Sequence, residues 1–126
     1  HVTSAGVIDW VVQADGKCRS IAPDGSGGAL VTGNFYETGS FGSTTLSRSG
    51  SSRVSDTFVM HVTSAGVIDW VVQADGKCRS IAPDGSGGAL VTGNFYETGS
   101  FGSTTLSRSG SSRVSDTFVM HVTSAG

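Results

Sequence analysis

The sequence predicts an all-β fold built from two identical four-stranded antiparallel sheets. Residues 1–60 and 61–120 match letter for letter, and the HVTSAG that opens the chain returns at residues 121–126. Short β-branched and aromatic stretches alternate with Gly-, Ser- and Asp-rich turn sequences, and no useful helical periodicity appears. A fixed period of this size is typical of repeat architectures, in which each unit buries its apolar faces against its neighbours.

Composition narrows the class of protein. Charged residues make up 14% of the chain and aromatic residues 8%, with 19 Gly and only 2 Pro, which is too apolar for a disordered chain. The net charge of −2 gives no sign of the basic surface that nucleic-acid binding normally needs. No apolar run reaches the roughly 20 residues of a membrane span. We therefore expect neither nucleic-acid binding nor membrane insertion.

The first half of each unit contains two expected strands. VIDWVVQA at residues 7–14 is β-branched and aromatic, and it ends at the turn pair Asp15-Gly16. CRSIA at residues 18–22 is a short second strand that stops at Pro23. The PDGSGG that follows is a turn sequence, in which Pro fixes φ and Gly supplies positive φ.

The second half supplies two more strands. ALVTGNF at residues 29–35 is the third, and DTFVMHVT at residues 56–63 is the fourth. The short SAG link then leads into the second copy of the first strand, residues 67–74. Because tight turns join most neighbouring strands, we expect an antiparallel meander.

Residues 38–55, between the third and fourth strands, hold ten Ser or Thr. Two interpretations stay open: a solvated loop with a small hairpin around SFGSTTL, or a platform for O-linked glycans.

The faces of these strands indicate how the sheets pack. Phe58, Met60 and Val62 point to one side of the fourth strand, whereas Val59 and His61 point to the other. Apolar residues on both faces require cover on both faces. Four strands per repeat and two covered faces are the properties of a β-propeller blade, which lies between two other blades.

The ordered motifs resemble one family. SIAPDGSGGALVTGNF, GSFGSTTLSRSGSS and SDTFVMHVTSAGVIDWVVQADG together resemble the SBBP-type bacterial β-propeller repeat over nearly the whole 60-residue unit. Cys18, Cys78 and the SRV at residues 52–54 depart from that pattern. The resemblance implies an extracellular or cell-surface protein, if natural, with a binding or structural role and no shared catalytic residues. From the axis outward, it implies the strand order 19–22, 29–35, 56–63 and 67–73.

This strand order predicts the organisation of the chain. Residues 1–18 form an outer strand and linker that complete another chain's blade, residues 19–78 form the first blade, and residues 79–126 form a second blade lacking its outer strand. We expect residues 7–13 of one chain to pair with residues 116–123 of the next. The residues expected in this inter-chain pairing are Val7, Ile8, Trp10, Val11, Val12, Phe118, Val119, Met120 and Val122.

Two blades do not close a ring, because propellers need about four to eight. The sequence therefore predicts a structural, self-assembling module whose partner is itself, forming a closed homo-oligomeric ring of about two to four chains. A filament or a longer parent array is the alternative architecture. The alternative function is a surface or extracellular binding module for a glycan or protein ligand.

Individual residues give little sign of chemistry. Trp10 and Trp70 suit packing between blades better than stacking on a sugar, and His61 and His121 suit a satisfied polar role better than metal ligation. Asp24, Ser26 and Gly27 fit a hairpin turn and match no calcium loop. The other acids considered are scattered without a paired partner in the sequence. They are Asp9, Asp15, Glu37 and Asp56.

Cys18 and Cys78 occupy equivalent positions, and free thiols are favoured over cross-links between neighbouring blades. The two thiols are expected to behave alike. With no catalytic arrangement visible, the sequence predicts no enzyme, no cofactor and no metal.

Overall fold

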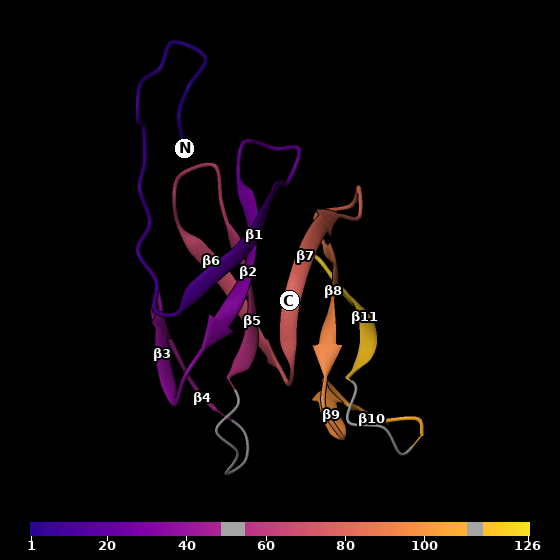
Figure 1. Ribbon diagram of the computed structural model, residues 1–126. Helices are drawn as coiled ribbons and strands as arrows, with labels where there is room; N and C mark the ends of the chain where they lie inside the picture. The colour runs from indigo at the N-terminus through magenta and orange to yellow at the C-terminus, as the bar shows by residue number, and fades with distance from the viewer. Residues whose placement is uncertain (49–54, 111–114) are drawn as a thin grey trace.

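The computed structural model describes residues 1–48, 55–110 and 115–126, and within these ranges it contains eleven strands and no helix (Figure 1). All the strand pairs are antiparallel. The all-β prediction is confirmed for the described residues. Nothing in those ranges forms a helix long and apolar enough to cross a membrane.

The first unit is a four-stranded meander. Strands β1 (Lys17–Pro23), β2 (Ala29–Phe35), β5 (Asp56–Val62) and β6 (Ile68–Ala74) pair in that order. These are the four strands that alternation and turn residues predict, with ends that differ by at most one residue. The turn between β1 and β2 is closed by Asp24, whose Oδ1 accepts hydrogen bonds from the backbone N–H groups of Ser26 and Gly28 at 2.7 and 2.9 Å. Asp24 is therefore a turn residue, as expected.

In the part of the chain that the structure describes, the second unit repeats three of these strands. Its sheet has the order β11 (Asp116–Val122), β8 (Ala89–Phe95), β7 (Lys77–Pro83). Strand β11 pairs with β8 through all seven residues. Among the described residues, no strand lies on the other edge of β11.

Each unit also carries a short hairpin, formed by β3 (Thr38–Phe41) and β4 (Thr44–Ser47), and by β9 (Thr98–Phe101) and β10 (Thr104–Ser107). The hairpin around SFGSTTL therefore forms, but it is not simply a solvated loop. Phe41 is fully buried, with its ring centroid 5.8 Å from that of Phe35 and 4.7 Å from that of Phe58. Residues 49–54 and 111–114 lie outside the described residues, and they include the SRV segment and part of the Ser-rich stretch.

Residues 7–14, expected as the first strand, form no strand in the single chain. The described residues there form only two isolated bridges, Val2 with Ile8 and Ala14 with Phe41. The identical letters at residues 67–74 form β6 because β5 pairs with them from Thr57 to Val62. Before residues 7–14, the chain has only residues 1–3 of this strand sequence, which correspond to residues 61–63 and so repeat only the end of β5. A partner strand, and not the amino-acid letters, makes this segment a strand.

Two apolar clusters form the core. One lies between the units, where Leu30 and Val59 of the first sheet meet Cys78 and Ile81 of the second. The other lies on the outer side of the first unit, where partly buried Trp10 and other residues of the N-terminal segment pack against buried residues. Those buried members are Ala29, Val31, Phe35, Phe41, Phe58, Met60 and Val62.

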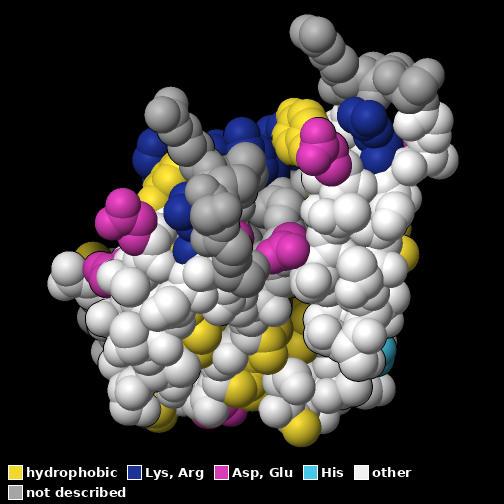
Figure 2. Space-filling view, turned by 90° about the horizontal axis from the view of Figure 1, so that it is seen from below, with side chains coloured by type: hydrophobic (Ala, Val, Ile, Leu, Met, Phe, Trp, Pro, Cys, Tyr) yellow, Lys and Arg dark blue, Asp and Glu magenta, His cyan; other side chains and the backbone are white. Residues whose placement is uncertain are grey.

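Surface charge is mixed. Seen from below, acidic and basic side chains lie together along one side of the view (Figure 2). The rest of that face is mostly uncharged, with hydrophobic side chains reaching the surface (Figure 2).

Candidate functional site

The edge of β11 with which no described strand pairs is the first part of the candidate site. Phe118 and Val122 are buried and Met120 is half-buried, whereas Val119 is 73% exposed. In β5 the same letters pair with β2 on one edge and with β6 on the other. Strand β11 thus has the sequence of an inner strand and the position of an edge strand.

The N-terminal segment is the second part. Val7, Ile8 and Val11 are between 58 and 80% exposed, and Trp10 and Val12 are half-buried. The structure does not bring this segment to β11 within one chain. Residues 1–14 run beside the β3 side of the molecule, and β11 lies on the opposite side (Figure 1).

The segment nevertheless keeps an outer-strand position against the first unit. Asp15 N donates to Ser40 O at 3.1 Å, and Ser40 N donates to Asp15 Oδ2 at 2.9 Å. The same two bonds join Asp75 and Ser100, at 3.0 and 2.8 Å. Residues 7–13 are therefore placed against the first unit as β6 is placed against the second.

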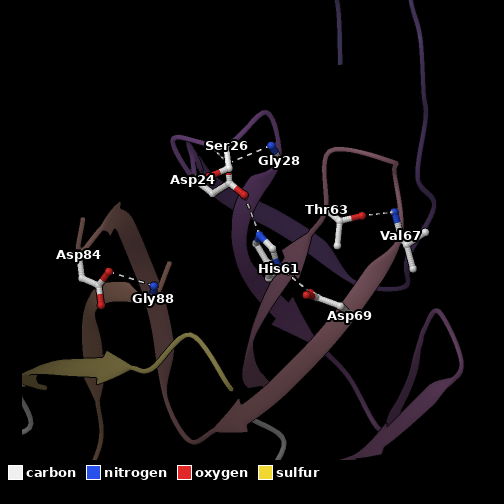
Figure 3. Close-up of polar contacts among 9 residues, drawn as sticks. All are labelled: Asp24, Ser26, Gly28, His61, Thr63, Val67, Asp69, Asp84 and Gly88. Carbon is white, nitrogen blue, oxygen red and sulfur yellow. Dashed lines mark hydrogen bonds and ion pairs between the residues drawn. The ribbon is translucent and has the colours of Figure 1, made fainter. Parts of the chain in front are cut away.

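A His–Asp cluster holds the fully formed sheet together at one end. His61 Nε2 lies 2.8 Å from Asp24 Oδ2, and His61 Nδ1 lies 2.7 Å from Asp69 Oδ1 (Figure 3). The imidazole also stacks on Trp70, with ring centroids 5.8 Å apart. The cluster connects the β1–β2 turn, β5 and β6. His61 is therefore a satisfied polar residue, and the described residues contain no group of side chains suited to a metal ion.

The cluster shifts the protonation of its members. Burial alone would lower the pKa of His61, but its hydrogen bonds with Asp24 and Asp69 outweigh burial and raise that pKa above its ordinary value. Burial alone would raise the pKa of Asp24, but the bonds from His61, Ser26 and Gly28 hold it below its ordinary value. Both shifts favour the charged pair.

The other two copies hold complementary halves of this cluster. His121 Nε2 lies 2.7 Å from Asp84 Oδ2, which reproduces the inner half. His1 Nδ1 lies 2.6 Å from Asp9 Oδ1, and the His1 ring stacks on Trp10 with centroids 5.4 Å apart, which reproduces the outer half. In the described residues, His121 lacks the carboxylate that Asp69 provides to His61.

Sequence reasoning missed the acids of this cluster. It treated Asp9 as a scattered acid and Asp24 as a turn residue alone. Asp69 is the extra residue where the β5–β6 register shifts between His61 and Val62, next to Trp70, and a bulge of this kind leaves no sign in the residue types. The recurring His–Asp spacing of eight residues was the one available signal.

The two cysteines are free but not equivalent in the single chain. Cys18 is exposed and Cys78 is buried. Burial raises the pKa of the Cys78 thiol, whose sulfur lies 3.7 Å from Asn34 Oδ1. The expectation that both thiols behave alike therefore fails here, because the second unit covers the face of the first and nothing in the described chain covers Cys18.

Comparisons with protein-family models, with curated proteins and with solved structures gave no match to this chain.

Proposed function

We propose that this chain is a structural, self-assembling β-propeller repeat module, in which residues 7–13 of one chain pair with β11 of the next. One observation carries the proposal. In the first unit, β5 is bound along its second edge by β6. In the second unit, the same strand has that edge free among the described residues, and the letters of β6 recur in a segment that forms no strand.

The register of the pairing follows from the first unit. Met60 lies opposite Val71, and His61 lies opposite Trp70. Strand β11 repeats β5 sixty residues later, and residues 7–13 repeat the β6 sequence sixty residues earlier. The same register therefore places Met120 opposite Val11 and His121 opposite Trp10 of the neighbouring chain. Pairing would cover the exposed side of Val11 and satisfy the backbone groups of both segments.

The same pairing completes the second His–Asp cluster. His121 already contacts Asp84 through Nε2. Asp9 stands in the segment where Asp69 stands in β6, so a neighbouring chain would present Asp9 to Nδ1 of His121. His1, which now contacts Asp9, carries the same side chain as the residue that would replace it.

The blade arrangement is supported by the four-strand order of the first unit, by apolar residues on both faces and by the SBBP-type resemblance. The expected assembly is head to tail, because the two joining segments differ. A ring of about four to eight blades accommodates two, three or four chains. A filament is the alternative outcome if the rotation per chain does not close.

The mass of the particle in solution tests this proposal. Size-exclusion chromatography with light scattering should show one discrete species of about two to four chains, because each chain supplies two blades and propellers have about four to eight. A chain lacking residues 1–13 should lose that species. A wild-type chain that stays monomeric across the concentration range, or a truncated chain that forms the same particle, would overturn the proposal.

One observation favours the alternative of a binding module. An open groove of about 690 Å³ lies between the β1–β2 and β7–β8 turns, and Asp24, His61 and Asp69 are among its lining residues. Polar side chains of this kind suit a hydroxyl-rich ligand. Saturable glycan binding in solution at one ligand per groove, lost in a His61→Ala variant, would support this alternative.

A further inference from the structure

We infer that the two outward sheet faces of the chain form a second, face-to-face contact between copies, with Leu90 and Val119 of one chain packing against Cys18 and Ile21 of the next. This inference rests on the proposed self-assembly, which makes the partner a second copy of the chain and the order of the chains head to tail. It adds the side chains that decide which surfaces meet.

Identical residues with different burial mark the first face. Val59 is fully buried, whereas Val119 is 73% exposed. Leu30 is fully buried, whereas Leu90 is 45% exposed. Because the letters of the two units are the same, the difference comes from what covers each sheet. The second unit covers this face of the first, and its own corresponding face is open.

The second face shows the reverse pattern. Ile81 is 6% exposed and Cys78 is buried. Their counterparts Ile21, which is 65% exposed, and Cys18 lie open on the first unit. The faces left open at the two ends are therefore the same two faces that meet inside the chain.

The contact inside the chain shows how specific that meeting is. Besides its apolar cluster, it contains a polar network in which Thr57 Oγ1 donates to Gly76 O at 2.9 Å and accepts from Cys78 N at 3.1 Å. Ile81 N also donates to Ser20 Oγ at 3.3 Å. The open faces carry the counterparts of all these groups, so a second copy can repeat every one of these bonds. The counterparts are Thr117 with Gly16 and Cys18, and Ser80 with Ile21.

A cavity marks the place that the second copy would fill. It measures about 340 Å³, and Trp10, Ile21, Val31 and Phe58 are among the mostly apolar residues that line it. Their counterparts Ile81, Val91 and Phe118 belong to one cluster with Leu30 and Val59 of the first unit, and Trp70 packs against that cluster. The cavity therefore lacks two side chains, and Leu90 and Val119 of another chain are the residues that match them.

Two charged substitutions test the contact. Ile21→Lys blocks one face and Val119→Lys blocks the other, and both side chains are exposed in the single chain, so the fold should persist by circular dichroism. Tyr36→Lys is the matched control, because Tyr36 and Tyr96 are exposed to the same degree, 51 and 49%, and so lie outside the contact.

Each blocked variant should lose the wild-type particle, and the control should keep it. A 1:1 mixture of the two blocked variants retains one intact pair of faces, so it should form a particle of two chains and no larger one. If both variants assemble as the wild type does while the chain lacking residues 1–13 does not, the face contact is wrong and the strand pairing stands. A mixture that forms no pair also overturns the face contact. If all three chains keep the particle, the proposed function itself fails.

Discussion

His61 and Asp69 join strands β5 and β6 through a contact of 2.7 Å between Nδ1 and Oδ1, at a point where the register of the two strands shifts (Figure 3). The contact belongs to the outer edge of the sheet, so it reports whether an outer strand is in place. The first unit has it, and the second unit lacks it among the described residues. The hydrogen-bond partners of this histidine therefore depend on whether the outer strand is paired.

The cluster predicts a pH dependence of stability. Because the pKa of His61 is raised on folding, its contribution is fully present below the ordinary histidine value of about 6.5 and is lost as the pH rises through the folded value. Because the pKa of Asp24 is lowered, its contribution is present above about 3.9 and is lost as the pH falls through the folded value. The pair stabilises most between these limits.

Asp69→Asn should therefore cost about 1 kcal/mol of the free energy of unfolding at pH 5.5 and clearly less at pH 9. Urea titrations of both chains at one fixed chain concentration measure this difference. Asparagine keeps the size and one acceptor oxygen of the aspartate, so the substitution removes mainly the charge. An equal loss at both pH values would show that His61 does not titrate against Asp69.

Phe41→Ala should destabilise the first unit strongly. Phe41 is fully buried between Phe35 and Phe58, and its removal leaves a cavity, so we expect a loss of about 3 kcal/mol in the free energy of unfolding. Tyr36→Ala is the control, with an expected change within about 0.5 kcal/mol because Tyr36 is exposed. Thermal unfolding of the two variants measures the contrast. Similar midpoints for both would show that the β3–β4 hairpin is not part of the core.

The sequence predicted the long strands of the first unit and their antiparallel order well, and the side-chain contacts that join them poorly. Strands β2 and β5 follow from runs of β-branched and aromatic residues between turn sequences. The β3–β4 hairpin was only half anticipated, because one buried Phe stands among Gly, Ser and Thr. Residues 7–13 show the limit most clearly, since the same letters form β6 in one place and no strand in another. Pairing partners decide such segments, and they cannot be read from the segment itself.

The cysteines give a direct readout of assembly. In a dissociated chain, exposed Cys18 should react with a thiol reagent at least about tenfold faster than buried Cys78, whose pKa is also raised. In the assembled particle, Cys18 should acquire the surroundings of Cys78, and the two rates should converge. Mass spectrometry of alkylated peptides at low and high chain concentration measures both rates. Unchanged, fast modification of Cys18 at high concentration would contradict burial of that face. Reducing agent should leave the particle intact, since both thiols are free.

Cross-linking through the proposed trans register is the most direct test of the central claim. Paired residues of antiparallel strands have Cα atoms about 4.5–5.5 Å apart, which suits a disulfide. In a chain whose Cys18 and Cys78 are replaced by alanine, Val11→Cys with Met120→Cys should therefore give covalent species of two or more chains on mild oxidation. Val11→Cys with Val119→Cys, one position out of register, is the matched control and should give few. Efficient cross-linking of the first pair alone is the result that trans strand pairing predicts. Monomers only, or equal cross-linking of both pairs, would contradict it.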